Sequence, residues 1–266
     1  MHILVTNDDG VQHPGLLALA QAMQPFGKVS ILAPDHNWSA AGHVKTLDRP
    51  LRVKEVVLNG GLSALACDGA PSDCVALALL GLLEKVDLVV SGINPHANLG
   101  HDITYSGTVT AAMEAAIGGV RGLAFSLDTP ENHHTPIQYE EAAAMAAEVV
   151  RITLKENLPP EILLNVNLPY RSRETIKGYR ITRTGQRIYR DELVRRADPR
   201  GRPYYWIGGD VPTGLGEENT DIGALAAGYV SITPIQLDLT AHSWLEALAS
   251  WNWPQPNSSS GKEPQA

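Results

Sequence analysis

Two adjacent carboxylates at the end of an apolar run are the residues of this chain best suited to chemistry. The first ten residues read MHILVTNDDG, so Asp8 and Asp9 follow an apolar run and precede a glycine. The run His2–Val5 predicts a strand buried on both faces, and Gly10 permits a sharp turn out of the sheet. Ligands of open α/β sheets bind beyond the carboxyl ends of the strands, where Asp8 and Asp9 would project. Asn-Asp-Asp-Gly is also ordinary turn chemistry, so these residues alone leave a metal site and a simple turn both open.

Two further loops could supply oxygen ligands to the same place. Ser39 and Asn94 each follow a predicted buried strand. Because parallel strands end at the same edge of a sheet, we expect both side chains to lie near Asp8 and Asp9. Two carboxylates, a hydroxyl and an amide form an all-oxygen set, which suits Mg²⁺, Mn²⁺ or Ca²⁺ better than Zn²⁺. Adjacent ionised carboxylates also repel each other unless a cation lies between them.

The turn Tyr105–Val109, with the sequence YSGTV, opens a predicted helix of small residues and could hold an anion. The first amides of a helix have no internal acceptor, and the hydroxyls of Ser106 and Thr108, beside Gly107, could join them in binding phosphate oxygens. Asn98 lies in the preceding loop, which is unusually long for an α/β unit, and such loops are often functional. Ser106 or Thr108 could instead only cap the helix.

Metal ligands beside an anion-binding helix end predict metal-assisted hydrolysis of a phosphate ester. Asp9 could take the proton from the attacking water, could be only a metal ligand, or could be a nucleophile that forms an aspartyl-phosphate. A histidine of the same loops, at position 36, 96 or 101, could line the site or donate a proton. No GxGxxG, Walker A or GxSxG motif is present, which disfavours dehydrogenases, NTPases and serine hydrolases.

The elements that must position these residues alternate between buried strands and amphipathic helices. This order predicts an α/β protein with a mostly parallel sheet. The patterns predict strands at 2–5, 28–33, 51–57, 62–67, 87–90, 123–127 and 162–166, and helices at 14–23, from about 72, at 107–117 and at 137–154. Beyond Pro169, residues 179–184 and 203–207 are predicted to be hairpin strands, followed by a strand at 228–233 and a short helix at 243–250.

This order of elements predicts three parts. Residues 1–169 form the catalytic core. Residues 170–253 form a smaller, hairpin-rich extension with a returning strand and a C-terminal helix, which packs on the core or on a partner subunit. Residues 254–266 are too polar and too rich in proline and serine to pack, and are predicted to be disordered.

Composition narrows the classes of protein. The chain has 266 residues, 44% of them hydrophobic and 19% charged, which is typical of a globular protein, and no apolar stretch approaches the roughly 20 residues of a membrane span. No signal peptide is recognisable, so a cytoplasmic location without a membrane partner is predicted. Cys67 and Cys74 cannot form a disulfide framework and are predicted to be small core residues. The formal net charge of -8 argues against a nucleic-acid polymer as partner.

Basic residues are concentrated in one segment, because 11 of the 21 lysines and arginines lie between Arg171 and Arg202. Such a segment could attract an anionic substrate. It could also be a solvated extension that pairs with an acidic surface or with another subunit.

Five sequence blocks in order resemble the SurE family, the survival-protein-E nucleotidases, and the resemblance runs from Met1 to about Trp253. The blocks are Asn7–Gly10 with Pro14-Gly15, Ala33–Asp35 with Asn37 and Ser39, Ser91–Asn94 with Asn98 and Gly100, Tyr105–Val109, and Gly228–Pro234 with Asp238–His242.

This resemblance implies a Rossmann-like three-layer core and a divalent-metal-dependent 5'-nucleotidase. Such an enzyme hydrolyses nucleoside 5'-monophosphates to nucleoside and phosphate, and sometimes 3'-nucleotides or short polyphosphate. The implied cofactor is one divalent metal ion per subunit, Mg²⁺ or Mn²⁺, held by Asp8, Asp9, Ser39 and Asn94. Family members form homodimers or homotetramers, with the hairpin and the C-terminal element used in assembly.

The chain departs from the family pattern where Pro95-His96-Ala97 follows Asn94, because the family usually has glycine two residues after this asparagine. A bulkier loop would narrow the pocket and change substrate preference. Two other classes of function remain as alternatives: a non-catalytic, metal-dependent nucleotide or phosphate sensor, and a receiver-like signalling domain. The latter needs a phospho-acceptor aspartate after a central strand, where this chain has Ser91–Asn94.

Overall fold

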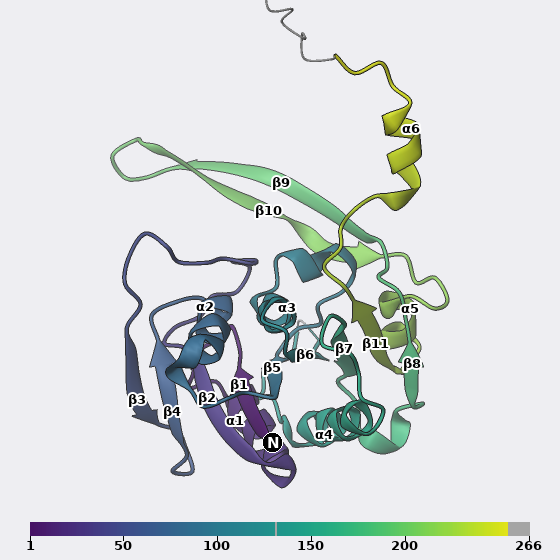
Figure 1. The fold of residues 1–266 in the computed structure, drawn as a ribbon. Helices are drawn as coiled ribbons and strands as arrows, with labels where there is room; N and C mark the ends of the chain where they lie inside the picture. The colour runs from purple at the N-terminus through teal and green to yellow at the C-terminus, as the bar shows by residue number, and fades with distance from the viewer. Residues whose placement is uncertain (131, 255–266) are drawn as a thin grey trace, which may run out of the picture. The chain divides into compact units, whose positions relative to one another are not determined.

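The centre of the fold is a nine-stranded mixed sheet (Figure 1), in a computed structural model that describes residues 1–130 and 132–254. The strand order is β3-β4-β2-β1-β5-β6-β7-β11-β8. The strands are β1 (His2–Thr6), β2 (Lys28–Pro34), β3 (Val53–Val57), β4 (Ser63–Cys67), β5 (Leu88–Asn94), β6 (Arg121–Asp128), β7 (Leu163–Pro169), β8 (Tyr179–Ile181) and β11 (Val230–Ile235). The six strands from β4 to β7 in this order are parallel, which confirms the predicted sheet.

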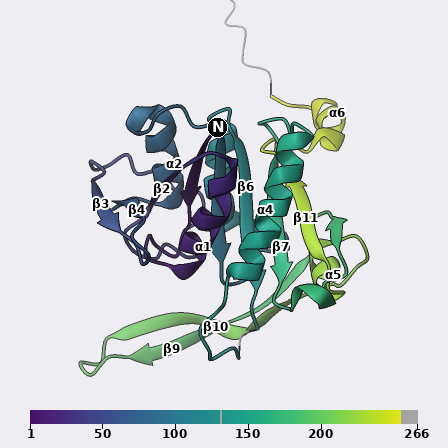
Figure 2. The ribbon, with the colours of Figure 1, turned by 90° about the horizontal axis from the view of Figure 1, so that it is seen from below.

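Helices cover both faces of this sheet, so that the core has the three layers predicted for it. α1 (Pro14–Met23) and α4 (Glu140–Lys155) lie side by side on one face (Figure 2), and α2 (Pro71–Leu77) and α3 (Gly107–Ile117) pack together on the other. A shorter helix, α5 (Asp221–Ala226), contacts β11 and β7. Pro14 suits the first position of α1 because the amide hydrogen that it lacks has no acceptor there.

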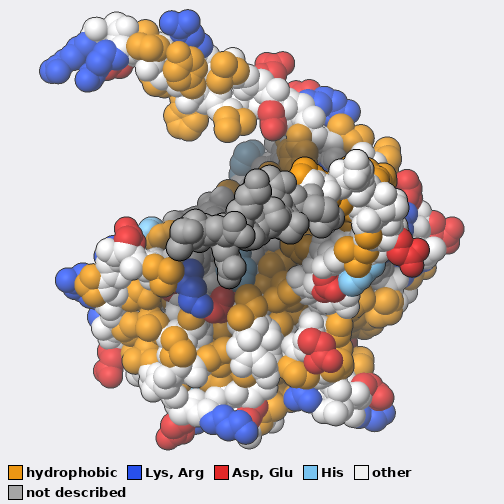
Figure 3. Space-filling model, turned by 45° about the horizontal axis from the view of Figure 1, so that its top comes forward, with side chains coloured by type: hydrophobic (Ala, Val, Ile, Leu, Met, Phe, Trp, Pro, Cys, Tyr) orange, Lys and Arg blue, Asp and Glu red, His pale blue; other side chains and the backbone are white. Residues whose placement is uncertain are grey.

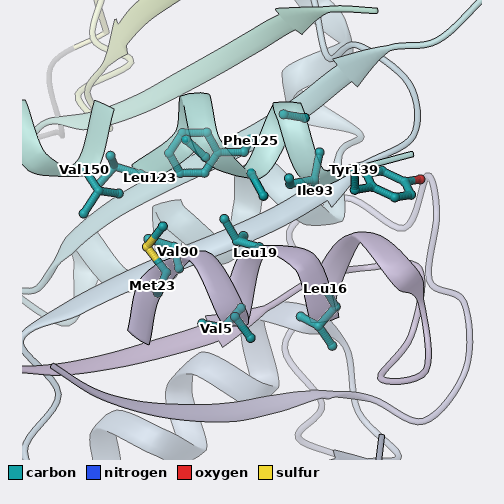
Figure 4. Packing of buried hydrophobic residues seen from close by; sticks show 14 of the residues in the cluster. Val5, Leu16, Leu19, Met23, Val90, Ile93, Leu123, Phe125, Tyr139 and Val150 are labelled. Atoms are coloured by element: carbon teal, nitrogen blue, oxygen red, sulfur yellow. The ribbon is translucent and has the colours of Figure 1, made fainter. Parts of the chain in front are cut away.

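Both faces of β1 are buried, as its apolar run predicts. Ile3 faces the side covered by α1, where Leu19 and Phe125 belong to the same hydrophobic cluster (Figure 4). Its neighbour Leu4 faces the opposite side and packs in a second cluster with residues of α2 and α3. Both cysteines are buried in this second cluster, which confirms that they are core residues.

A long two-stranded hairpin, formed by β9 (Arg187–Ala197) and β10 (Pro203–Gly214), extends from the core (Figure 1). Of the two predicted hairpin strands, 203–207 lies in the hairpin, within β10, whereas the prediction for 179–184 is wrong, because β8 pairs with β11 at the edge of the main sheet. The sequence of β9, RIYRDELVRRA, has no alternation of apolar and polar residues. A strand shows that alternation when one of its faces is buried, and most side chains of β9 are exposed.

The hairpin exposes many hydrophobic side chains. Leu193 and Ile207 face each other across its two strands and are 73% and 83% exposed. Figure 3 shows hydrophobic side chains along this arm and basic side chains at its tip. Monomeric proteins rarely expose many large hydrophobic side chains on one element, and such surfaces often mark sites of association with another protein.

The chain divides into two compact units, Met1–Gln236 and Leu237–Ala266, and the sheet and hairpin belong to the first. The second contains a 3₁₀ turn at His242–Trp244 and the short helix α6 (Leu245–Ala249). The predicted disordered tail, 254–266, lies outside the described residues from 255 onward. The predicted boundary at residue 169 remains a prediction. No helix of the described chain is long and apolar enough to cross a membrane.

We expect Leu19→Ala to lower the free energy of unfolding by about 2–5 kcal/mol, because Leu19 is fully buried between α1 and the sheet. Leu80→Ala is the matched control, since that side chain is 83% exposed, and its effect should stay below about 0.5 kcal/mol. Urea unfolding followed by circular dichroism measures both values. Equal effects of the two substitutions would contradict this packing of α1.

Candidate functional site

The turn that follows β1 carries Asp8 and Asp9 to the edge of the sheet. The Asn7 side-chain nitrogen donates a hydrogen bond to the carbonyl oxygen of Gly10 at 3.0 Å and closes the turn. Gly10 has a φ of +106°, and a Cβ on it would lie 3.3 Å from the carbonyl carbon of His36, so a side chain there would be strained. These residues therefore form a tight turn and also present two carboxylates at the strand end.

Asp8 is held by the first turn of α3. The hydroxyl of Thr108 donates a hydrogen bond to Oδ1 of Asp8. The helix comes so close that a Cβ on Gly107 would lie 2.6 Å from the Cβ of Asp8, which leaves no room for a side chain. Burial raises the pKa of Asp8, and the hydrogen bond from Thr108 opposes that increase. Strand end and helix start are thus joined at this carboxylate.

Asp9 has an oxygen that the surrounding protein leaves unsatisfied. Within the described residues, its buried Oδ2 accepts no hydrogen bond. Nδ1 of His13 lies 3.7 Å from this oxygen, and burial lowers the pKa of His13, which disfavours the charged imidazolium. Burial, followed by the negative charge of Asp8, raises the pKa of Asp9 to about 7. A cation beside the two carboxylates would compensate their charge, so this pair fits a bound metal ion.

The other two predicted metal ligands, Ser39 and Asn94, line the same cavity as the two aspartates. The backbone amide of Trp38 donates to the carbonyl oxygen of Asp8 at 2.7 Å and holds the Ser39 loop against β1. The Asn94 side-chain nitrogen donates to a backbone carbonyl of its own loop, which leaves its amide oxygen free for a cation. The structure thus brings the four residues together, and their oxygens suit a hard divalent cation; ligation itself remains a prediction.

This cavity has a volume of about 240 Å³. Its walls come from the loops after β1 and β2, from the end of β5 and the loop that follows it, and from the N-cap of α3. The lining residues are Asp8, Asp9, Ser39, Ala40, Asn94, Pro95, His96, Ala97, Asn98, Asp102, Tyr105 and Ser106. Among the three histidines of the predicted loops, His96 is therefore the one that lines the site.

Asn98 is fixed by a network of polar side chains on β6 and β7. Its backbone amide donates to Oδ1 of Asn167 at 2.8 Å, and its side-chain nitrogen donates to the Ser126 hydroxyl at 2.8 Å. The side-chain nitrogens of Asn165 and Asn167 donate to the carbonyl oxygen of Asn98 at 2.9 and 3.1 Å. An amide nitrogen carries two hydrogens, so Asn98 keeps one that could reach a phosphate oxygen.

Ser106 both caps α3 and lines the cavity. Its Oγ accepts a hydrogen bond from the Val109 amide at 3.1 Å, and its hydroxyl hydrogen can still donate to a ligand. Thr108 is fully buried and gives its hydroxyl hydrogen to Asp8, and its backbone amide also interacts with that carboxylate and helps to lower its pKa. The backbone amide of Gly107 acts on the Asp8 carboxylate in the same way, and the residues that line the cavity include Ser106 but neither Gly107 nor Thr108. The phosphate contacts of these residues and of Asn98 remain predictions.

Sequence reasoning missed Asp102, which links the cavity to the hairpin. Its carboxylate accepts hydrogen bonds from Nε of Arg187 at 2.7 Å and from the Tyr189 hydroxyl at 2.6 Å, both on β9. Its carbonyl oxygen accepts from the amides of Tyr105 and Ser106 at 3.0 and 3.1 Å. The base of the hairpin therefore holds the segment that carries the cavity residues Asp102, Tyr105 and Ser106.

A second missed residue, Asp221, is fully buried and fixes the same loop from the other side. It accepts hydrogen bonds from the amides of Gly100, Gly185 and Ile222 at 2.7–2.8 Å. Neither aspartate has a local sequence signal, because the partners lie far away along the chain. Asn165 and Asn167 do have one: two asparagines on the same face of an otherwise apolar strand indicate a buried polar network.

We expect Asp9→Asn to stabilise the metal-free protein, increasingly as the pH rises. The pKa of Asp9 in the fold, about 7, exceeds its ordinary value of 3.8, so the folded state loses stability as the pH rises from about 4 to about 7. Asparagine has no such titration, and the gain should reach about 2–4 kcal/mol above pH 7.

Urea unfolding in the presence of a chelator at pH 5 and pH 8 measures this gain. Asp191→Asn, which removes an exposed carboxylate on β9, should show no comparable increase. A gain for Asp9→Asn that is the same at both pH values would contradict the electrostatic origin.

Comparison with known proteins gives one consistent result. The profile of the family described as "Survival protein SurE" matches residues 3–191. "5'-nucleotidase SurE" of Chloroflexus aggregans is 55% identical over 256 residues, which cover 95% of this chain and 100% of that protein. "5'-nucleotidase SurE 1" of Thermus thermophilus is 49% identical over 94% of this chain and 97% of its own length.

Solved structures agree with the sequence matches. The crystal structure of the SurE protein from Aquifex aeolicus superposes with a TM-score of 0.78 at 40% identity, covering 93% of this chain and 98% of that one. Sequence and fold thus match over nearly the whole chain, and the chain belongs to the SurE family.

Proposed function

We propose that this chain is a divalent-metal-dependent 5'-nucleotidase, which hydrolyses nucleoside 5'-monophosphates to nucleoside and phosphate. One observation carries the proposal: a buried carboxylate pair with an unsatisfied oxygen shares a cavity with Ser106, the N-cap residue of α3. The first is suited to a cation and the second to an anion. Relatives at 48–55% identity over 95% of the chain bear the name "5'-nucleotidase SurE".

Asp8, Asp9, Ser39 and Asn94 would hold one divalent cation per subunit, Mg²⁺ or Mn²⁺. The all-oxygen donor set and the unsatisfied Oδ2 of Asp9 support this assignment. When bound, the cation would polarise the phosphoryl group and lower the pKa of a bound water.

The protein's own groups divide the remaining work. Thr108 keeps the carboxylate of Asp8 in one orientation. The hydroxyl of Ser106 and the side-chain amide of Asn98, which both line the cavity, would bind phosphate oxygens near the positive end of the α3 dipole. We assign Asp9 as the residue that accepts the proton of the attacking water, because Asp9 lines the cavity and its Oδ2 accepts no hydrogen bond from a described donor.

The purified protein should release phosphate from AMP with Mg²⁺ or Mn²⁺, and a chelator should abolish the reaction. Asp9→Asn should lower kcat at least about 100-fold through loss of the proton acceptor. A panel of AMP, GMP, CMP and UMP, 3'-AMP and short polyphosphate then defines the substrate range. Asp191→Asn serves as the control for removal of a carboxylate.

Turnover that survives the chelator, or an active Asp9→Asn enzyme, would contradict this mechanism. Tight binding of AMP without any phosphate release would assign the chain instead to the sensor class.

We also propose that the chain forms a homodimer or homotetramer through the hairpin. Light scattering should give a multiple of the 28.6 kDa chain mass. The double substitution Leu193→Ser and Ile207→Ser should reduce this mass, because both exposed side chains lie on the apolar surface of the arm. A wild-type mass of one chain would reject the proposal, and an unchanged circular dichroism spectrum would show that the variant is folded.

A further inference from the structure

The cavity at the two aspartates is too small for a whole nucleotide. Its volume is about 240 Å³, whereas pockets that enclose a complete drug-sized ligand measure about 300–1,000 Å³. If the phosphate lies at the start of α3, the base of the nucleotide must lie outside the cavity, near the exposed residues at its rim. Among the lining residues, those that carry an aromatic ring are His96 and Tyr105, and both are exposed.

Tyr105 combines a fixed backbone with a free ring. Its amide donates to the Asp102 carbonyl oxygen at 3.0 Å, and its own carbonyl oxygen accepts from the Gly42 amide at 2.9 Å. Its side chain is nevertheless 59% exposed. Tyr105 directly precedes Ser106, and both residues line the cavity. His96 instead follows the predicted metal ligand Asn94.

Residues of the hairpin fix the loop that carries Tyr105. Arg187 and Tyr189 bind both carboxylate oxygens of Asp102, and the carbonyl oxygen of Asp102 in turn binds the Tyr105 amide. A ring whose backbone is fixed in this way loses little freedom when a ligand stacks on it, which favours binding.

We propose that Tyr105 is the platform on which the base of the nucleotide substrate stacks, and that it selects nucleotides over simple sugar phosphates. The inference rests on the proposed nucleotidase function. Every base has a π face, so stacking tolerates different bases. Tyr105 would therefore distinguish substrates that have a base from those that lack one, and would discriminate only weakly between different bases.

The experiment compares AMP with ribose 5-phosphate, which carries the same phosphate and sugar without a base. In Tyr105→Ala, KM for AMP should rise about tenfold with kcat little changed, because a stacked base loses that much on removal of the ring. KM for ribose 5-phosphate should stay within about twofold. Tyr105→Phe should restore the low KM for AMP, since it restores the ring. His96→Ala, at the same cavity, should raise KM for AMP less than Tyr105→Ala does.

Equal effects of Tyr105→Ala on both substrates, or no effect on AMP, would overturn the inference. A loss specific to AMP in His96→Ala but not in Tyr105→Ala would overturn it as well. Calorimetric titration with adenosine tests base binding without hydrolysis, so a failure of the stacking proposal can be distinguished from a failure of the proposed nucleotidase function. If the wild-type protein hydrolyses neither substrate, the nucleotidase proposal fails, and an adenosine affinity that is unchanged in Tyr105→Ala then rejects the platform.

Discussion

The repulsion between two adjacent carboxylates in a buried position is the constraint on which the rest of the site depends. Asp8 and Asp9 leave the same strand end, and both have pKa values raised by burial. A flexible surrounding would let them separate or reach water, so the fold must hold them. β1 is buried on both faces, and the glycine of α3 lets the helix start within contact distance of Asp8. The site is thus destabilising for the empty protein and favourable for a cation, which is how many metal-binding proteins store binding energy.

Several parts of the chain that never touch the aspartates serve to keep this arrangement fixed. The asparagines of β7 fasten the loop after β5, and Asp221 fastens the same loop to the segment before β9. These are satisfied polar contacts in a buried setting, which specify one geometry more strictly than apolar packing does. The sheet brings the site residues to one edge, and the polar network fixes the positions of the loops at that edge.

Much of this could be predicted from the sequence because local patterns carry it. α1 and α3 begin and end at the predicted residues, since proline and serine mark their starts and burial sets their faces. Asp8, Asp9, Ser39 and Asn94 were found because each follows a strand, and parallel strands share an edge. β9 was missed because a strand exposed on both faces has no apolar period. Asp102 and Asp221 were missed because a single sequence does not show which distant residues pair. Asp102 binds Arg187, which lies 85 residues further along the chain, and Asp221 binds the amide of Gly100, which lies 121 residues before it.

The hydrogen bonds from Arg187 and Tyr189 to Asp102 connect the hairpin arm, β9 and β10, directly to the wall of the cavity. Any shift of the first residues of β9 would be transmitted to the loop beneath Tyr105 and Ser106. Any association of subunits through the arm would then be thermodynamically linked to ligand binding: a ligand that favours one conformation of this loop would also favour the arm geometry that goes with it, and by the same factor. Occupancy of the cavity and the assembly of the protein would, on this basis, depend on each other in a concentration-dependent way.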